Sequence, residues 1–81
     1  QGALGEAEGV FSRACALEPY DERAYRGLMW CRAQSGDQAG AARLYLDCAQ
    51  ILHDELGTDP SPETLALYES IQEGIAPPAL G

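Results

Sequence analysis

Residues 36–52 read Gly-Asp-Gln-Ala-Gly-Ala-Ala-Arg-Leu-Tyr-Leu-Asp-Cys-Ala-Gln-Ile-Leu, and their pattern also occurs 34 residues earlier in the chain. Four pairs share this step: Ala7 and Ala41, Phe11 and Tyr45, Gly2 and Gly36, and Ala14 and Cys48. A fixed period of this length is typical of proteins built from repeated helix pairs. One such pair cannot bury its own apolar face and must stack on neighbours. The period therefore predicts a stacked helical fold that serves binding rather than chemistry.

The composition fits one small domain. The chain has 81 residues, of which 46% are hydrophobic, which is ordinary for a globular protein and too high for a disordered one. A chain of this length buries only about 60–65% of its unfolded surface, so its stability should be modest. It does not begin with Met, and we expect it to be a fragment of a larger protein.

The charge balance argues against nucleic acid as a direct partner. The chain has thirteen acidic residues and five basic ones, all of them Arg, which gives a net charge of −8. Nucleic-acid affinity depends largely on neutralising phosphates, and this chain shows no basic cluster. The same charge argues against anionic membrane surfaces. No apolar run approaches the roughly 20 residues that span a bilayer.

Three cysteines, Cys15, Cys31 and Cys48, each fall within a helical pattern. An odd number without short pairing indicates reduced thiols, which we expect to be small buried residues of a cytoplasmic protein. One His and scattered Cys do not supply the four close ligands of a zinc site. No metal or cofactor is expected.

The first half of the chain predicts two helices. Apolar residues spaced by three and four indicate a helix over residues 3–18, which Pro19 ends. Asp21 is placed to cap a second helix, which runs to about residue 35.

A third helix follows a tight turn. Gly36 is placed to leave the second helix in a left-handed conformation, and Asp37 can cap the next one. The apolar pattern continues through residues 38–56, and Gly57 should end it.

The fourth helix begins with a hydroxyl cap and a proline. Ser61 can accept from the free N–H groups of the first turn, and Pro62 has no N–H to leave unpaired. The pattern ends near residue 73, and residues 74–81 are expected to be a linker or a disordered tail. The chain is therefore expected to be all-α, with about four helices and short antiparallel connections.

The repeat resembles the tetratricopeptide motif. Counted from Glu22, the motif positions are filled by Tyr25 and Leu28, by Gly36-Asp37 at the turn, by the small residue Ala41, by the aromatic Tyr45 and by Cys48. This resemblance implies helix hairpins stacked in a right-handed solenoid. The chain departs from the motif at Met29, where a small residue is usual, and at His53, where a proline is usual.

The segment after His53 is more specific. Residues 55–63 read Glu-Leu-Gly-Thr-Asp-Pro-Ser-Pro-Glu, and Leu67-Tyr68-Glu69 follows. Together with residues 18–24 and the Gly36-Asp37 turn, they resemble the bacterial transcriptional activator domain. That tetratricopeptide-like module accompanies a winged-helix DNA-binding domain in regulators of the antibiotic-regulatory-protein class. The resemblance covers residues 4–73 and implies regulation of transcription, with the DNA-binding domain outside this chain.

The resemblance has one departure near its most specific motif. Family members tend to carry basic residues before Glu-Leu-Gly, whereas Gln50, His53 and Asp54 stand here. We expect no contact that depends on those charges.

Two surfaces are candidates for contact with partners. Arg23, Arg26 and Trp30 share one face of the second helix, and guanidinium groups beside an indole could hold an acidic partner segment. The plainer interpretation is a solvated helix face. Leu4, Val10 and Phe11 would form an exposed apolar patch on the first helix, which predicts self-association, for example as a homodimer.

The sequence contains no residue pattern that indicates catalysis. His53 is the only histidine, it has no partner nucleophile at a recognisable spacing, and it is expected to interact with a helix C-terminus. The first hypothesis is therefore a non-enzymatic protein-interaction module of a bacterial regulator, which contacts its DNA-binding domain, a second copy or the transcription machinery. The alternative is a generic tetratricopeptide adaptor that binds peptide segments and is unrelated to transcription. A basic winged-helix domain upstream of the chain would favour the first.

Overall fold

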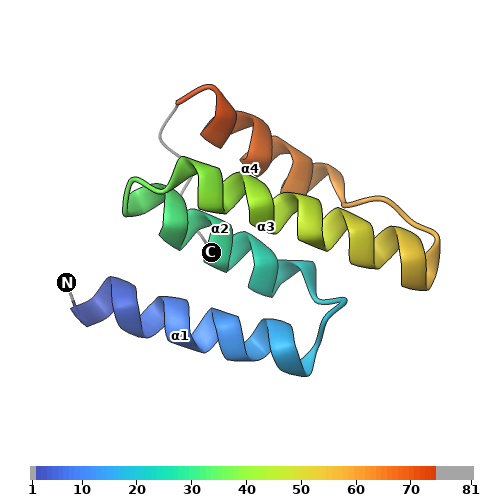
Figure 1. Ribbon diagram of the computed structural model, residues 1–81, viewed down its shortest axis with the longest axis horizontal. Helices are drawn as coiled ribbons and strands as arrows, with labels where there is room; N and C mark the ends of the chain where they lie inside the picture. The colour runs from blue at the N-terminus through green and yellow to red at the C-terminus, as the bar shows by residue number, and fades with distance from the viewer. Residues whose placement is uncertain (1, 75–81) are drawn as a thin grey trace.

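The computed structural model describes residues 2–74, with side chains from residue 5 onward. Four α-helices follow one another along the chain: α1 (Gly2–Leu17), α2 (Glu22–Gln34), α3 (Gln38–Ile51) and α4 (Pro62–Gln72). They lie side by side (Figure 1), and residues 2–74 contain no strand. The expected all-α fold of four helices is confirmed. Apart from Gly74, the predicted linker or tail over residues 74–81 lies outside the described residues.

Helix α2 is the centre of the arrangement. It packs against α1 on one side and against α3 and α4 on the other, and α3 also packs on α4. Among the described helices the backbone of α1 lies close to α2 alone, so α1 forms one edge of the molecule and α4 the other (Figure 1). These contacts agree with stacked helix pairs, while the right-handed superhelix stays a prediction.

The helix starts are set by the side chains that the sequence indicates. The Asp21 carboxylate accepts from the Arg23 N–H at 3.0 Å, and Asp37 accepts from the Gly40 N–H at 2.9 Å. Ser61 accepts from the Thr64 N–H at 3.4 Å. Each bond satisfies a donor that the first helical turn leaves free, so all three predicted caps are confirmed.

The end of α3 differs from the expectation in one respect. The helix continues without interruption into a π-helical turn, η1 (Leu52–Leu56), before Gly57 ends it at φ +67°. The predicted end at Leu56 and the left-handed Gly57 are confirmed, as is Gly36 at φ +88°. The π turn was missed because apolar spacing continues across it, whereas a π turn is a change in backbone hydrogen bonding.

The core has two clusters. One joins α2, α3 and α4 through fully or almost fully buried Met29, Ala41, Leu67 and Ile71. Beside it the rings of Tyr45 and Tyr68 stack with their centroids 4.1 Å apart.

The second cluster joins α2 to the C-terminal part of α3. Its buried members are Tyr25, Cys48 and Leu52, and Cys15 of α1 packs against them. Cys31 and Cys48 are buried free thiols, as expected, whereas Cys15 is only half-buried. This difference leaves Cys15 as the most accessible of the three thiols.

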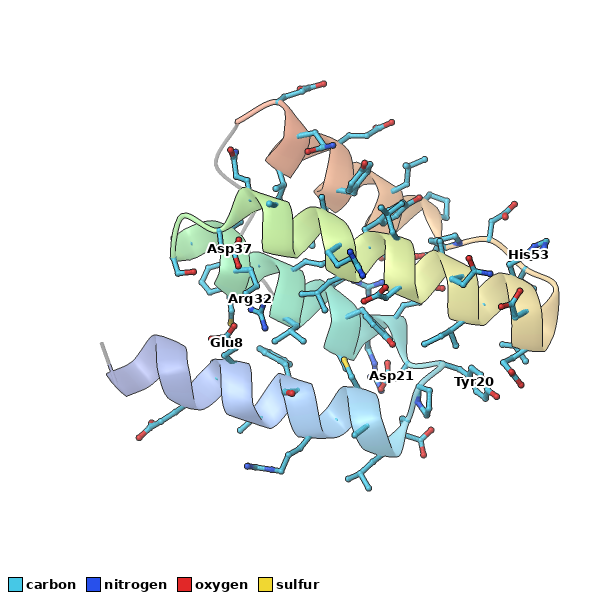
Figure 2. All side chains as sticks on the ribbon, in the orientation of Figure 1. Glu8, Tyr20, Asp21, Arg32, Asp37 and His53 are labelled. Carbon is cyan, nitrogen blue, oxygen red and sulfur yellow. The ribbon has the colours of Figure 1, made fainter. Side chains whose placement is uncertain are left out.

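Helix α1 is held on α2 by a close approach and an ion pair. The Phe11 ring lies against Gly27, where a Cβ atom would overlap it. Arg32 pairs with Glu8 of α1, and its guanidinium also lies 3.6 Å from Asp37 at the start of α3 (Figure 2). Arg32 thus links three consecutive helices.

Candidate functional site

The specific Ser-Pro-Glu-Thr segment forms a polar cluster between α2 and α4. Thr64 is fully buried, and its hydroxyl lies 2.7 Å from Oε1 of Glu22. The same carboxylate oxygen accepts from the backbone N–H of Ser61 at 2.8 Å. Arg26 donates to the Thr64 hydroxyl at 3.0 Å. The segment therefore fastens the start of α4 to the first two turns of α2.

This cluster gives Arg26 a contact inside the domain that the sequence did not predict. The sequence places Arg26 on a face for partners, but its guanidinium is turned to a buried hydroxyl inside the domain. Sequence reasoning missed Glu22 and Thr64. A signal for Thr64 was present, because Thr64, Leu67 and Ile71 follow the i, i+3, i+7 spacing of one buried helix face.

The structure does not bring Arg23, Arg26 and Trp30 together as one open surface. The Arg23 side chain is 82% exposed and lies 3.2 Å from Asp21. The hydrogen bond from Arg23 lowers the pKa of the Asp21 carboxyl. Trp30 is half-buried, and its indole N–H is enclosed without a hydrogen-bond partner among the described residues. A partner role for these residues stays a prediction.

The residues of the predicted self-association patch also differ in exposure. Val10 is 53% exposed, whereas the Phe11 ring is half-buried against Gly27 of α2. The side chain of Leu4 lies outside the described ones. Leu17, which sequence reasoning did not select, is the most exposed large apolar residue that the structure describes, at 79%. Self-association through this end also stays a prediction.

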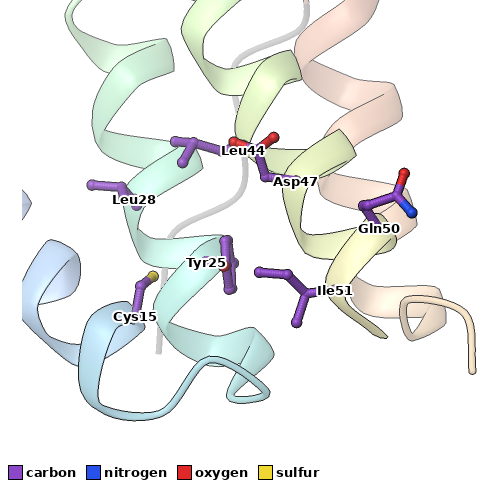
Figure 3. A pocket seen from close by; sticks show the side chains of 7 residues that line it. All are labelled: Cys15, Tyr25, Leu28, Leu44, Asp47, Gln50 and Ile51. Atoms are coloured by element: carbon purple, nitrogen blue, oxygen red, sulfur yellow. The ribbon is translucent and has the colours of Figure 1, made fainter. Parts of the chain in front are cut away.

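An open pocket lies between α1 and α3, over α2 (Figure 3). Its volume is about 360 Å³. Its seven lining residues come from three helices: Cys15, Tyr25, Leu28, Leu44, Asp47, Gln50 and Ile51. Burial is the main cause that raises the pKa of Tyr25, followed by the neighbouring Cys15, Cys48 and Asp47. The spacing of these residues along the chain did not predict this pocket, because they come from three different helices.

The one histidine of the chain is not part of any such cluster. His53 is exposed in the π turn, and Figure 2 shows it apart from the other labelled residues. Near it, the Tyr20 hydroxyl lies 3.4 Å from Glu55, which links the α1–α2 turn to η1. Within residues 2–74 no three His, Cys, Asp or Glu side chains gather as metal ligands.

The fold and these contacts define a small acidic all-α module. In it, the start of α4 is held on α2 by the hydrogen bonds of Glu22 to Ser61 and Thr64. The chain belongs to the bacterial transcriptional activator domain family, whose model matches residues 1–72. It is therefore a module of transcription regulators, and the resemblance seen in residues 55–63 is confirmed. The family is a regulatory domain rather than a catalytic one.

Two relatives are large regulators. The chain is 39% identical over 80 residues to the regulatory protein AfsR of Streptomyces coelicolor, and the match covers 99% of the chain. It is 37% identical over 81 residues to the AfsR protein of Streptomyces griseus, with 96% of the chain covered. In both cases the chain spans only 8% of the relative's length. No solved structure gave a significant match.

Among the described residues, none of the helices has both the length and the apolar character needed to cross a bilayer.

Proposed function

We propose that this chain is the protein-contact module of a bacterial transcriptional regulator and that a separate domain of the regulator binds DNA. Its partners would be that DNA-binding domain, a second copy of the module or the transcription machinery. The cytoplasm is the compartment that this role requires.

The observation that supports this proposal is the engagement of the arginines. Among the described residues, four of the five have polar partners inside the domain: Arg23 with Asp21, Arg26 with Thr64, Arg32 with Glu8 and Asp37, and Arg43 with Asp47. The surface that remains is anionic, with a net charge of −8 for the chain. Such a surface repels phosphates and suits contact with protein.

The alternative of a generic tetratricopeptide adaptor has less support. Membership of the activator domain family and the likeness to two regulatory proteins favour the regulator. The adaptor hypothesis rests on the helical repeat alone, which many unrelated proteins share.

The proposal is tested in the full-length regulator that carries the module. Deleting residues 1–73 should leave DNA affinity in a gel-shift assay nearly unchanged and should abolish activation of a promoter reporter. Loss of DNA affinity alone, with activation per bound molecule unchanged, would contradict the proposal.

A point substitution asks which surface makes the contact. Arg23→Glu changes an exposed residue and should lower activation without changing the urea midpoint. Arg13→Glu is the matched control, since Arg13 is also exposed and the change in charge is the same. Arg26 is unsuitable for this test because its loss would weaken the α2–α4 cluster. Equal activation by both variants would remove Arg23 from the contact surface.

Sedimentation tests the hypothesis that the partner is a second copy of the module. If Val10 and Leu17 form a contact between copies, sedimentation should show a concentration-dependent dimer that Val10→Glu dissociates. A monomer at all concentrations would exclude a second copy as the partner.

A further inference from the structure

The pocket between α1 and α3 has the size and lining of a docking site. Its volume is about 360 Å³, whereas an apolar cavity of about 150 Å³ already accepts benzene. It can therefore hold about two large apolar side chains. Five of the seven lining residues, Cys15, Tyr25, Leu28, Leu44 and Ile51, present mainly apolar surface.

The hydroxyl of Tyr25 is available to an occupant of this pocket. The Tyr25 side chain is 6% exposed and lies between Cys15 and Ile51 in the middle of the pocket (Figure 3). No hydrogen bond joins its hydroxyl to another residue in the part of the chain that the structure describes. The hydroxyl oxygen is not fully enclosed, unlike the indole nitrogen of Trp30, so it can form a hydrogen bond with an occupant of the pocket.

The charges around the pocket favour a cationic occupant. Asp47, 54% exposed, lies on the rim, and the Asp21 carboxylate is close enough to raise the pKa of the Cys15 thiol, after the larger effect of burial. The last turn of α1 carries no basic residue. Asp47 pairs with Arg43 at 3.6 Å, but both side chains are more than half exposed, so this pair is weak and an incoming cation can compete for the carboxylate. The negative charge of the chain adds a longer-range attraction for a basic segment.

We propose that this pocket docks a basic amphipathic segment of a protein partner. Apolar side chains of the segment would sit over Tyr25, and its Arg or Lys side chains would face Asp47. This assignment rests on the proposed function as a protein-contact module and names the chemistry of the partner. A second copy of this chain fits poorly, because the chain has no Lys and four of its five Arg already pair with groups of the same domain.

The thiol of Cys15 can report whether the pocket is occupied. Cys15 lines the pocket and is half-buried, whereas Cys31 and Cys48 are buried. Iodoacetamide should therefore alkylate Cys15 first in the folded protein. A synthetic helical peptide with leucines on one face and arginines on the other should slow this alkylation and shift the amide NMR signals of Leu28, Leu44 and Ile51. Replacing its arginines by glutamate should abolish both effects.

Charge substitutions then locate the contact. Asp47→Lys should weaken peptide binding about tenfold or more, and Asp47→Asn should weaken it less. Glu69→Lys on α4 gives the same change in net charge away from the pocket and should have a smaller effect. Tyr25→Phe should weaken binding about two- to tenfold, as expected for one lost hydrogen bond. Urea denaturation checks that each variant is folded.

Two results would overturn the proposal. One is peptide binding that leaves Cys15 unprotected or that responds equally to Asp47→Lys and Glu69→Lys. The other is protection of Cys15 by small neutral apolar compounds but not by the peptide, which would indicate a ligand pocket. If either occurs while deletion of residues 1–73 still abolishes promoter activation, the module remains a protein-contact module and only the docking surface is wrong.

Discussion

The hydroxyl of Thr64 lies 2.7 Å from Oε1 of Glu22, 42 residues away in the sequence. Glu22 stands in the first turn of α2 and Thr64 in the first turn of α4. The hydroxyl donates to the carboxylate and accepts from Arg26, so it joins an acid and a base in a buried site. The most specific motif of the sequence, which begins α4, therefore holds α4 against α2.

Thr64→Val should destabilise the fold by about 1–3 kcal/mol, because it leaves the half-buried Glu22 carboxylate and Arg26 guanidinium each short of a partner. The shape of the side chain is preserved, so the loss reports the hydroxyl. Urea denaturation measures it, and Thr64→Ser, which keeps the hydroxyl, should recover most of the stability. Equal losses in the two variants would show that the methyl group matters instead.

Gly27→Ala should separate α1 from α2. The added Cβ would overlap the Phe11 ring, and such overpacking costs about 1–3 kcal/mol. Limited proteolysis at the Pro19-Tyr20 turn and urea denaturation should both detect the change. Gly9→Ala is the control, since nothing lies within 4 Å of its Cβ position and alanine favours the helix by up to about 1 kcal/mol. A stable, protease-resistant Gly27→Ala variant would contradict this packing.

Gly57→Ala should cost about 1–2 kcal/mol, because residue 57 has φ +67° and a Cβ atom disfavours this conformation. Gly57→Asn should cost less, since asparagine tolerates the left-handed region. Thermal denaturation of the two variants gives the comparison. If alanine and asparagine are equally tolerated, the π turn does not depend on a left-handed end.

The stability of the module should fall as pH rises from 9.0 to about 11. Burial, with a smaller contribution from Glu22, raises the pKa of Cys48 from 9.0 to about 11. Above pH 9.0 the unfolded thiol loses its proton while the folded one keeps it, so the free energy of unfolding decreases. Denaturation across this range should show a shallower decrease for Cys48→Ala. A residual decrease is expected, because burial also raises the pKa of Cys31 and Tyr25. Identical pH profiles would contradict a buried Cys48 thiol.

Local signals in the sequence predicted the helices and their ends well. Asp21, Asp37 and Ser61 each cap a helix, and Gly36 and Gly57 end one, as expected. These predictions succeed because a cap or a left-handed glycine depends on residues only a few positions apart.

The predicted partner surfaces stay predictions, because helix periodicity gives the face of a residue but not what covers that face. Arg23 and Arg26 lie three residues apart on α2, yet one is exposed and the other donates to Thr64. Phe11 was expected on an exposed patch, and it lies against Gly27 instead.

The sequence by itself determined the all-α class, the helix boundaries and the family, because all three depend on short-range patterns and on the run over residues 55–63. Only the tertiary structure decided that Thr64 meets Glu22, that Arg26 is engaged inside the domain, and that a pocket opens over Tyr25. Those features join residues of different helices, and their geometry depends on how whole helices pack. No spacing along one helix encodes that packing.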